Sequence, residues 1–194
     1  MIRLISVLVL GAALSGCVSL GGKPPESLLS LSSVAQVAAN DSRTAQAGEA
    51  ITIHVPVVPQ ALANNRVLVT NGATALAYVK DAVWAEPPAR LFQRVLSETV
   101  AARTGRVVLD VRQLALDQGL QVTGTLSAFG IDPNAGAAVV IYDAAMTVDH
   151  GRTVRTRRFE ARVPLGEIKP DSVGRALNAA ANKVAEDVAG WIAG

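Results

Sequence analysis

Aromatic residues are scarce in this chain, at only 4% of 194 residues. This scarcity argues against the rows of stacking side chains that single-stranded nucleic acids or sugars require. Charge of one sign is also lacking, because 18 basic residues face 16 acidic ones and the net charge is +2. A nucleic-acid binder needs a concentrated basic face, so we predict no nucleic-acid partner. The chain also lacks a Gly-x-x-x-x-Gly-Lys-Ser/Thr phosphate loop, which argues against ATP hydrolysis.

Residue types that carry catalysis or metal binding are few. His54 and His150 are the only histidines, and neither has a cysteine or second histidine at the spacing of a zinc site. No Gly-x-Ser-x-Gly motif marks an activated serine. We therefore predict a protein without metal, cofactor or enzymatic activity.

The single cysteine, Cys17, closes a segment that is typical of an export signal. Arg3 precedes an apolar run over residues 4–14, and small residues follow the run. This run is much shorter than the about 20 residues that a membrane-spanning helix needs. The residues that end the segment resemble a lipobox, the cleavage site of lipoprotein signal peptidase: Leu14, Ser15, Gly16 and Cys17.

This resemblance implies a signal peptide over residues 1–16 and a lipid anchor on Cys17, made of a diacylglyceryl thioether and an N-acyl chain. Three acyl chains would hold the protein firmly, since one chain alone binds only marginally. Residues 17–26, with paired glycines and prolines, are predicted to be a tether. By analogy with other lipoproteins, Val18 favours the outer membrane over the inner one, with the domain facing the periplasm. The alternative is an ordinary signal peptide followed by an incidental cysteine.

Residues 27–194 are predicted to form one α+β domain. We expect a mainly antiparallel or mixed β-sheet with two amphipathic helices packed on one face. Apolar alternation and turn residues predict strands over 27–31, 51–55, 66–70, 74–83, 106–110, 120–131, 137–148 and 153–163. Helices are expected from Pro87 to about Arg103 and from Pro170 to about Ile192, with Asp171 as the N-cap of the second. Residues 32–49 are predicted to be an irregular connection.

Arginines crowd one predicted hairpin, at positions 152, 155, 157, 158 and 162. Strand alternation places Arg155 and Arg157 on one face and Arg158 and Arg162 on the other. Charge on both faces is typical of an exposed edge strand. Two interpretations follow: a solvated edge, or a contact with anionic lipid headgroups or an acidic partner through Arg155, Arg157 and Arg158.

Two stretches of the chain are similar to one known family. They are residues 51–69, with a Val-Pro…Arg pattern that ends near Arg66, and residues 78–88, with a Tyr…Trp-x-Glu-Pro pattern around Trp84. Together with the lipobox, they resemble the ABC-type transport auxiliary lipoproteins, the PqiC-like lipoproteins of MCE lipid-transport systems. The resemblance implies a non-enzymatic auxiliary that works with a periplasmic MCE-domain protein and an ABC permease and ATPase. Its expected task is to help move phospholipid, or a related hydrophobic molecule, between the inner and outer membranes.

Several interpretations stay open at this point. Trp84 and Tyr78 are either interface anchors or packing residues at the junction of strand and helix. Arg66, with Pro56 and Pro59, either shapes an edge that binds a partner or belongs to structural turns. Such lipoproteins could also form a homo-oligomer around their partner. Two alternatives to a docking auxiliary are a lipid-binding shuttle with its own apolar pocket and a structural envelope lipoprotein unrelated to transport.

Overall fold

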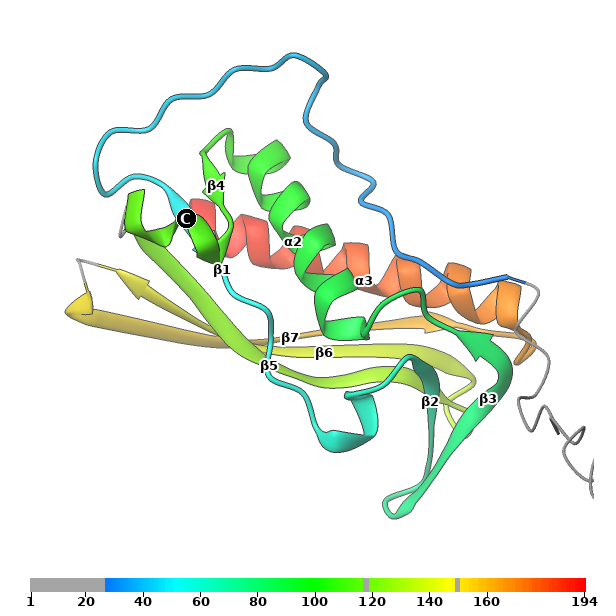
Figure 1. Ribbon diagram of the computed structural model, residues 1–194. Helices are drawn as coiled ribbons and strands as arrows, with labels where there is room; N and C mark the ends of the chain where they lie inside the picture. Colours follow the sequence, from blue (N-terminus) through cyan, green and yellow to red (C-terminus); the bar gives the residue numbers. More distant parts are fainter. Residues whose placement is uncertain (1–26, 117–118, 149–150) are drawn as a thin grey trace, which may run out of the picture.

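The computed structural model describes residues 27–116, 119–148 and 151–194 (Figure 1). The predicted signal peptide, Cys17 and the tether lie outside these residues, as does His150. The elements follow in the order β1 (Ile51–Ile53), β2 (Arg66–Asn71), β3 (Ala75–Val83), α2 (Pro88–Thr104), β4 (Val108–Leu109), β5 (Leu120–Asp132), β6 (Ala137–Val148), β7 (Thr153–Pro164) and α3 (Pro170–Ala193). Two 3-10 turns, η1 (Gln60–Leu62) and η2 (Val111–Leu116), lie between them.

The sheet has seven strands and is mixed, as predicted. Long antiparallel strands β5, β6 and β7 form a meander, and β7 is an edge because it pairs only with β6. On its other side β5 has two neighbours: its first residues pair in parallel with β1, and its last residues pair in parallel with β2. The sheet therefore divides beyond β5 into a β1–β4 branch and a β2–β3 branch, both visible in Figure 1.

The two helices lie against the same face of the sheet and against each other (Figure 1). Helix α2 begins at Pro88, where a missing N–H costs nothing, and ends at Gly105, whose φ of 69° suits glycine. Buried residues of α3 recur at helical spacing, from Val173 through Leu177 and Val184 to Val188. The hydrophobic core therefore lies between the helix pair and the inner face of the sheet.

Three local predictions need correction. The strand expected over 27–31 is reduced to one parallel bridge between Leu29 and Trp84, and the one expected over 106–110 to the two residues of β4. The N-cap of α3 is Lys169, not Asp171, because Pro170 takes the first helical position. Asp171 lies in the first turn instead, where its negative charge is favourable near the helix N-terminus.

Candidate functional site

The outer edge of β7 is the most prominent unpaired feature in the described part of the chain. Its 12 residues form an unbroken register with β6 on one side, and the opposite side pairs with no described strand. Such an edge presents backbone N–H and C=O groups to which another strand can be added. The arginines predicted on this strand are all exposed.

The arginines on the uncovered face of the sheet have carboxylate partners. Arg158 donates from Nε and Nη2 to the two carboxylate oxygens of Asp143 on β6, at 2.6 and 3.0 Å. These hydrogen bonds, with one from Ser127, hold the pKa of Asp143 below its usual range. Arg162 lies beside Glu160 and Asp132, at 2.6 and 3.7 Å. The predicted contact role of Arg158 is therefore weakened, because its guanidinium is already engaged.

Arg155 and Arg157 lie on the opposite face, next to the last turns of α3, as alternation predicted. Their guanidinium carbons lie 5.7 Å from the ring centre of Trp191 and 5.1 Å from that of Phe159, respectively. Phe159 and Trp191 in turn pack together with ring centres 5.6 Å apart. Neither arginine has a carboxylate within salt-bridge distance in the described residues.

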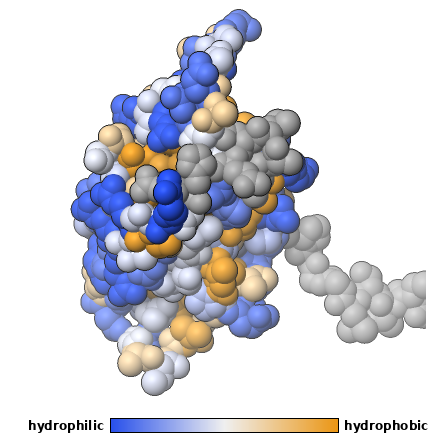
Figure 2. Space-filling view, turned by 90° about the vertical axis from the view of Figure 1, so that its left-hand side faces the viewer, coloured by the Kyte–Doolittle hydropathy of each residue, from blue (hydrophilic) through white to orange (hydrophobic). Residues whose placement is uncertain are grey.

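A hollow of about 480 Å³ runs between β7 and the end of α3. We call it the β7 hollow; its lining residues are Arg157, Arg158, Phe159, Glu160, Glu186, Asp187, Gly190 and Trp191. Glu186 is neutralised by Arg103 of α2, which donates to both of its carboxylate oxygens at 2.7 to 2.9 Å. Figure 2 views the end of the molecule that carries the β6–β7 turn and shows hydrophobic residues there only as separate small groups.

Trp84 is fully buried and is therefore not an accessible contact residue. Its ring packs against Phe129 with centres 5.5 Å apart, and its backbone N–H donates to Asn65. These contacts favour the packing interpretation for Trp84. Arg66 is exposed and stacks 4.2 Å above the ring of Tyr78, whose hydroxyl donates to the Ala61 carbonyl. This arrangement links β2 and β3 to η1 and lies on a different branch of the sheet from β7.

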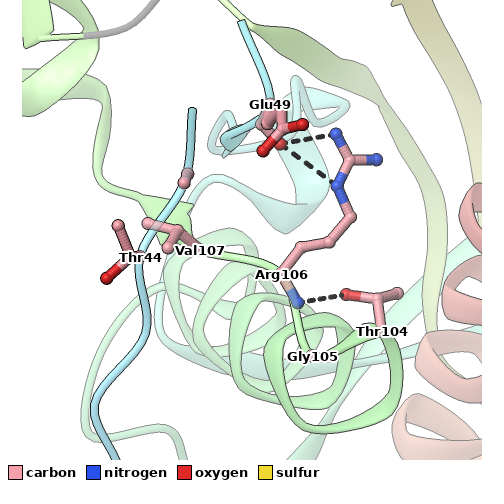
Figure 3. Close-up of a pocket in the computed structure, with 7 residues that line it drawn as sticks. Thr44, Glu49, Thr104, Gly105, Arg106 and Val107 are labelled. Atoms are coloured by element: carbon pink, nitrogen blue, oxygen red, sulfur yellow. Dashed lines mark hydrogen bonds between the residues drawn. The ribbon is translucent and has the colours of Figure 1, made fainter. Parts of the chain in front are cut away.

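A second hollow, of about 330 Å³, lies where α2 leads into β4 (Figure 3). Its arginine, Arg106, donates from Nε and Nη2 to the backbone carbonyl of Glu49, at 3.1 and 2.5 Å. The backbone N–H of Arg106 donates to the hydroxyl oxygen of Thr104 at 3.2 Å. These contacts fasten the segment before β1 to the end of α2, so the polar groups here serve the fold.

Sequence reasoning missed an amide clamp on α3. Asn182 accepts the Val34 N–H at 2.8 Å and donates to the Ser32 carbonyl at 2.9 Å. One turn earlier, Asn178 accepts the Ser32 N–H at 2.9 Å. We call these two asparagines the Asn clamp. The available signal was a pair of asparagines at i and i+4 on a helix otherwise rich in Ala and Val.

The described chain enters the domain at the end opposite the β6–β7 turn. Leu29 donates to the Val83 carbonyl at the end of β3, and its side chain lies against Gly174 near the start of α3. Figure 1 shows this end far from the β6–β7 turn, with β7 running between the two. A strand rises about 3.3 Å per residue, so Arg157 lies about 23 Å along β7 from Pro164. The arginine-rich part of β7 is therefore remote from the point where the predicted tether joins the domain.

The described residues contain no group of three or more His, Cys, Asp or Glu side chains placed to hold a metal ion. His54 Nε2 lies 2.8 Å from the Gln121 side-chain oxygen across the β1–β5 pair. Within the same described ranges, no helix is long and apolar enough to cross a membrane.

Known structures share this fold. A crystal structure of a Xanthomonas campestris protein assigned to DUF330 matches with a TM-score of 0.69 at 16% identity, covering 86% of this chain and 94% of that one. A crystal structure of an uncharacterized protein matches with a TM-score of 0.66 at 14% identity, covering 86% and 99%. At these identities the likeness concerns the fold alone. No curated protein matches the chain.

The family model described as "ABC-type transport auxiliary lipoprotein component" matches residues 29–189, which include every strand, the whole of α2 and all of α3 except residues 190–193. Its members are lipid-anchored auxiliaries of transport systems rather than enzymes. The resemblance seen in the sequence is thereby confirmed: this chain belongs to the ABC-type transport auxiliary lipoprotein component family.

Proposed function

We propose that this protein is the lipid-anchored docking component of an ABC-type system that moves phospholipid, or a related hydrophobic molecule, across the periplasm. Its partners would be a periplasmic MCE-domain protein and the permease and ATPase of the same system. The observation that carries the proposal is family membership over residues 29–189, together with the lipobox that ends at Cys17. The phospholipid cargo and the MCE partner come from the family resemblance.

The position of the predicted anchor supports a docking role. A tether over residues 17–26 would reach at most about 35 Å, at about 3.5 Å per residue. The domain would thus remain near the membrane, with the end that holds Leu29 and the start of α3 nearest to it. The β6–β7 end would face the periplasm, where a partner that spans this space can reach it. Val18 favours the outer membrane as the site of anchoring.

The described hollows do not favour a lipid-binding shuttle. Ligand pockets are mostly lined by hydrophobic and aromatic side chains. The hollows of about 480, 330 and 320 Å³ all include charged side chains, among them Asp187, Glu49 and Glu98. The buried large apolar side chains pack instead into one core cluster. A docking role fits this distribution better than enclosure of an acyl chain.

Co-purification from native membranes tests the proposal. The acylated wild type should retain the ATPase, the permease and the MCE-domain protein after gentle solubilisation. Cys17→Ala should lose the anchor and most of this association, whereas Ser19→Ala, two residues away, should retain both. Recovery of only unrelated envelope proteins with the wild type would refute the transport role. Abundant phospholipid in native mass spectra of the purified protein would favour the shuttle.

Membrane sorting is tested separately. Val18→Asp should redirect the protein from the outer to the inner membrane, as measured by density-gradient separation of the two. An unchanged distribution would contradict outer-membrane sorting through this residue and would leave the transport role standing.

A further inference from the structure

We propose that the outer edge of β7 binds an extended acidic segment of a partner protein, which adds to the sheet as an eighth strand. This inference deepens the proposed function by assigning the surface and chemistry of docking. The starting observation is geometric: β7 is long, has an unbroken register with β6, and pairs with no described strand on its other side. Addition of a strand to such an edge is a recurring mode of peptide recognition.

Charge determines what kind of strand this edge accepts. Residues 152–164 contain five arginines and one glutamate, a local excess of four positive charges in a chain whose net charge is only +2. A second copy of this chain would bring the same excess to the pairing, so like charges oppose self-association through β7. An acidic segment gains cross-strand attraction instead.

Arg155 and Arg157 are the residues left to make that contact. Arg158 and Arg162 are occupied by carboxylates on the uncovered face, whereas these two lie on the helix face without one. Their guanidinium groups lie near the rings of Trp191 and Phe159. An arginine held against an aromatic ring keeps N–H donors directed outward, in a geometry suited to a carboxylate.

The β7 hollow adds a local preference for small apolar side chains next to the acidic one. Beyond Arg157 its apolar part consists of the nearly buried rings of Phe159 and Trp191, and Asp187, one turn before Trp191 in α3, contributes a carboxylate. A ligand strand should therefore carry two acidic side chains opposite Arg155 and Arg157. Small apolar side chains should follow on the same face, opposite Phe159, and acidic ones would be repelled near Asp187. This pattern distinguishes a fitted segment from any polyanion.

The position of the edge favours a protein over a lipid headgroup. Arg155 and Arg157 lie toward the β6–β7 turn, at the opposite end of β7 from the point where the chain enters the domain. An anchor attached at that end would direct these arginines away from its own membrane. We therefore assign the surface to an acidic protein segment, and membrane binding becomes an outcome that would overturn the proposal.

The test uses the full acylated protein in detergent with synthetic eight-residue peptides. The probe peptide has the sequence Thr-Glu-Thr-Glu-Thr-Val-Thr-Val. A second peptide has the reverse sequence, so that both parallel and antiparallel addition are covered. A Lys-for-Glu peptide is the charge control. Fluorescence anisotropy should show binding of one Glu peptide and none of the Lys peptide.

Variants identify the residues. Arg155→Gln with Arg157→Gln should weaken binding about tenfold, because two exposed charge pairs with the peptide are lost. Arg155→Glu with Arg157→Glu should reverse the preference and bind the Lys peptide, a gain that a misfolded protein cannot produce. The matched control is Arg90→Gln with Arg175→Gln, two exposed arginines on the helices, which should bind like the wild type.

Backbone methylation tests strand addition itself. N-methyl groups on one alternate set of peptide residues should abolish binding, and those on the other set should be tolerated, because only every second N–H of an added strand points to β7. Equal binding of both methylated peptides would reduce the contact to charge attraction and overturn the proposal. Equal binding of the Glu peptide to the wild type and to the Arg155→Glu, Arg157→Glu variant would also overturn the proposal. In a last arm, anionic vesicles are added. If the vesicles capture the wild type through these arginines and binding of the Glu peptide is lost, the surface binds lipid instead.

Failure here is separable from failure of the proposed function. If the wild type and the Arg155→Glu, Arg157→Glu variant both co-purify with the transporter, docking through β7 is wrong and the transport role stands. If the wild type recovers no transporter, the transport role is wrong whatever the peptides show.

Discussion

Removal of the Asn clamp should loosen the segment that connects the anchor to the domain. Asn182 is nearly buried and makes two hydrogen bonds to the backbone of residues 32 and 34. A hydrogen bond contributes about 1 kcal/mol net, and some apolar contact is lost as well, so Asn182→Ala should cost about 2 to 3 kcal/mol. For a domain of this size about 1 kcal/mol shifts the melting temperature by about 2 to 4 °C, so a fall of about 4 to 12 °C is expected.

Thermal melts and hydrogen exchange measure this effect together. Amide exchange at Val34 should become much faster in Asn182→Ala, while amides of β5 and β6 change only with global stability. Asn178→Ala, which loses one bond to the segment, should cost about 1 kcal/mol. Lys183→Ala, an exposed change on the same helix, is the control and should leave both readouts unchanged. An unchanged melting temperature with slow exchange at Val34 in Asn182→Ala would refute the clamp.

Three further predictions concern the sheet and the helix. Gly130→Ala should destabilise the domain by about 2 kcal/mol or more in urea melts, because a Cβ there would overlap the Leu68 carbonyl and separate β5 from β2. Gly190→Ala has open space in α3 and should instead stabilise it by about 0.5 to 1 kcal/mol, as measured in the same melts. Arg158→Gln should lower the stability at neutral pH only slightly, since the ion pair is solvent-exposed. Because the folded-state pKa of Asp143 is lowered, the difference in free energy of unfolding between the wild type and Arg158→Gln should be constant above pH of about 5 and shrink as the pH falls below about 4. A difference that grows in acid would contradict this prediction.

Much of the fold could be predicted because its signals are local. Alternation in β5, β6 and β7 and the turn residues between them define the meander, and Pro88 and Gly105 enclose α2. The distribution of Arg155 and Arg158 on opposite faces of β7 also follows from alternation alone. These features depend on residues near each other in sequence, so the sequence pattern is sufficient.

The remainder depends on contacts between distant residues. The placement of β1 between β4 and β5 is parallel and involves partners more than fifty residues away, which no local pattern determines. Residues 32–35 show no periodicity because their order comes from the Asn clamp and from Ser33, whose hydroxyl lies 3.0 Å from that of Thr99 on α2. The division of the arginines into paired and unpaired groups required knowledge of Asp143 on the neighbouring strand.

The hydrogen bonds between residues 32–34 and α3 have a consequence for the order of folding. Residues 32–34 are held by Asn178 and Asn182, across sequence separations of 146 to 150 residues. During synthesis and export the N-terminal part emerges first, so the clamp residues arrive last. Residues 32–34 therefore cannot reach their final position until α3 has also been exported. A chain that stops before Pro170 would leave that segment, and the exposed inner face of the sheet, open to proteolysis in the envelope.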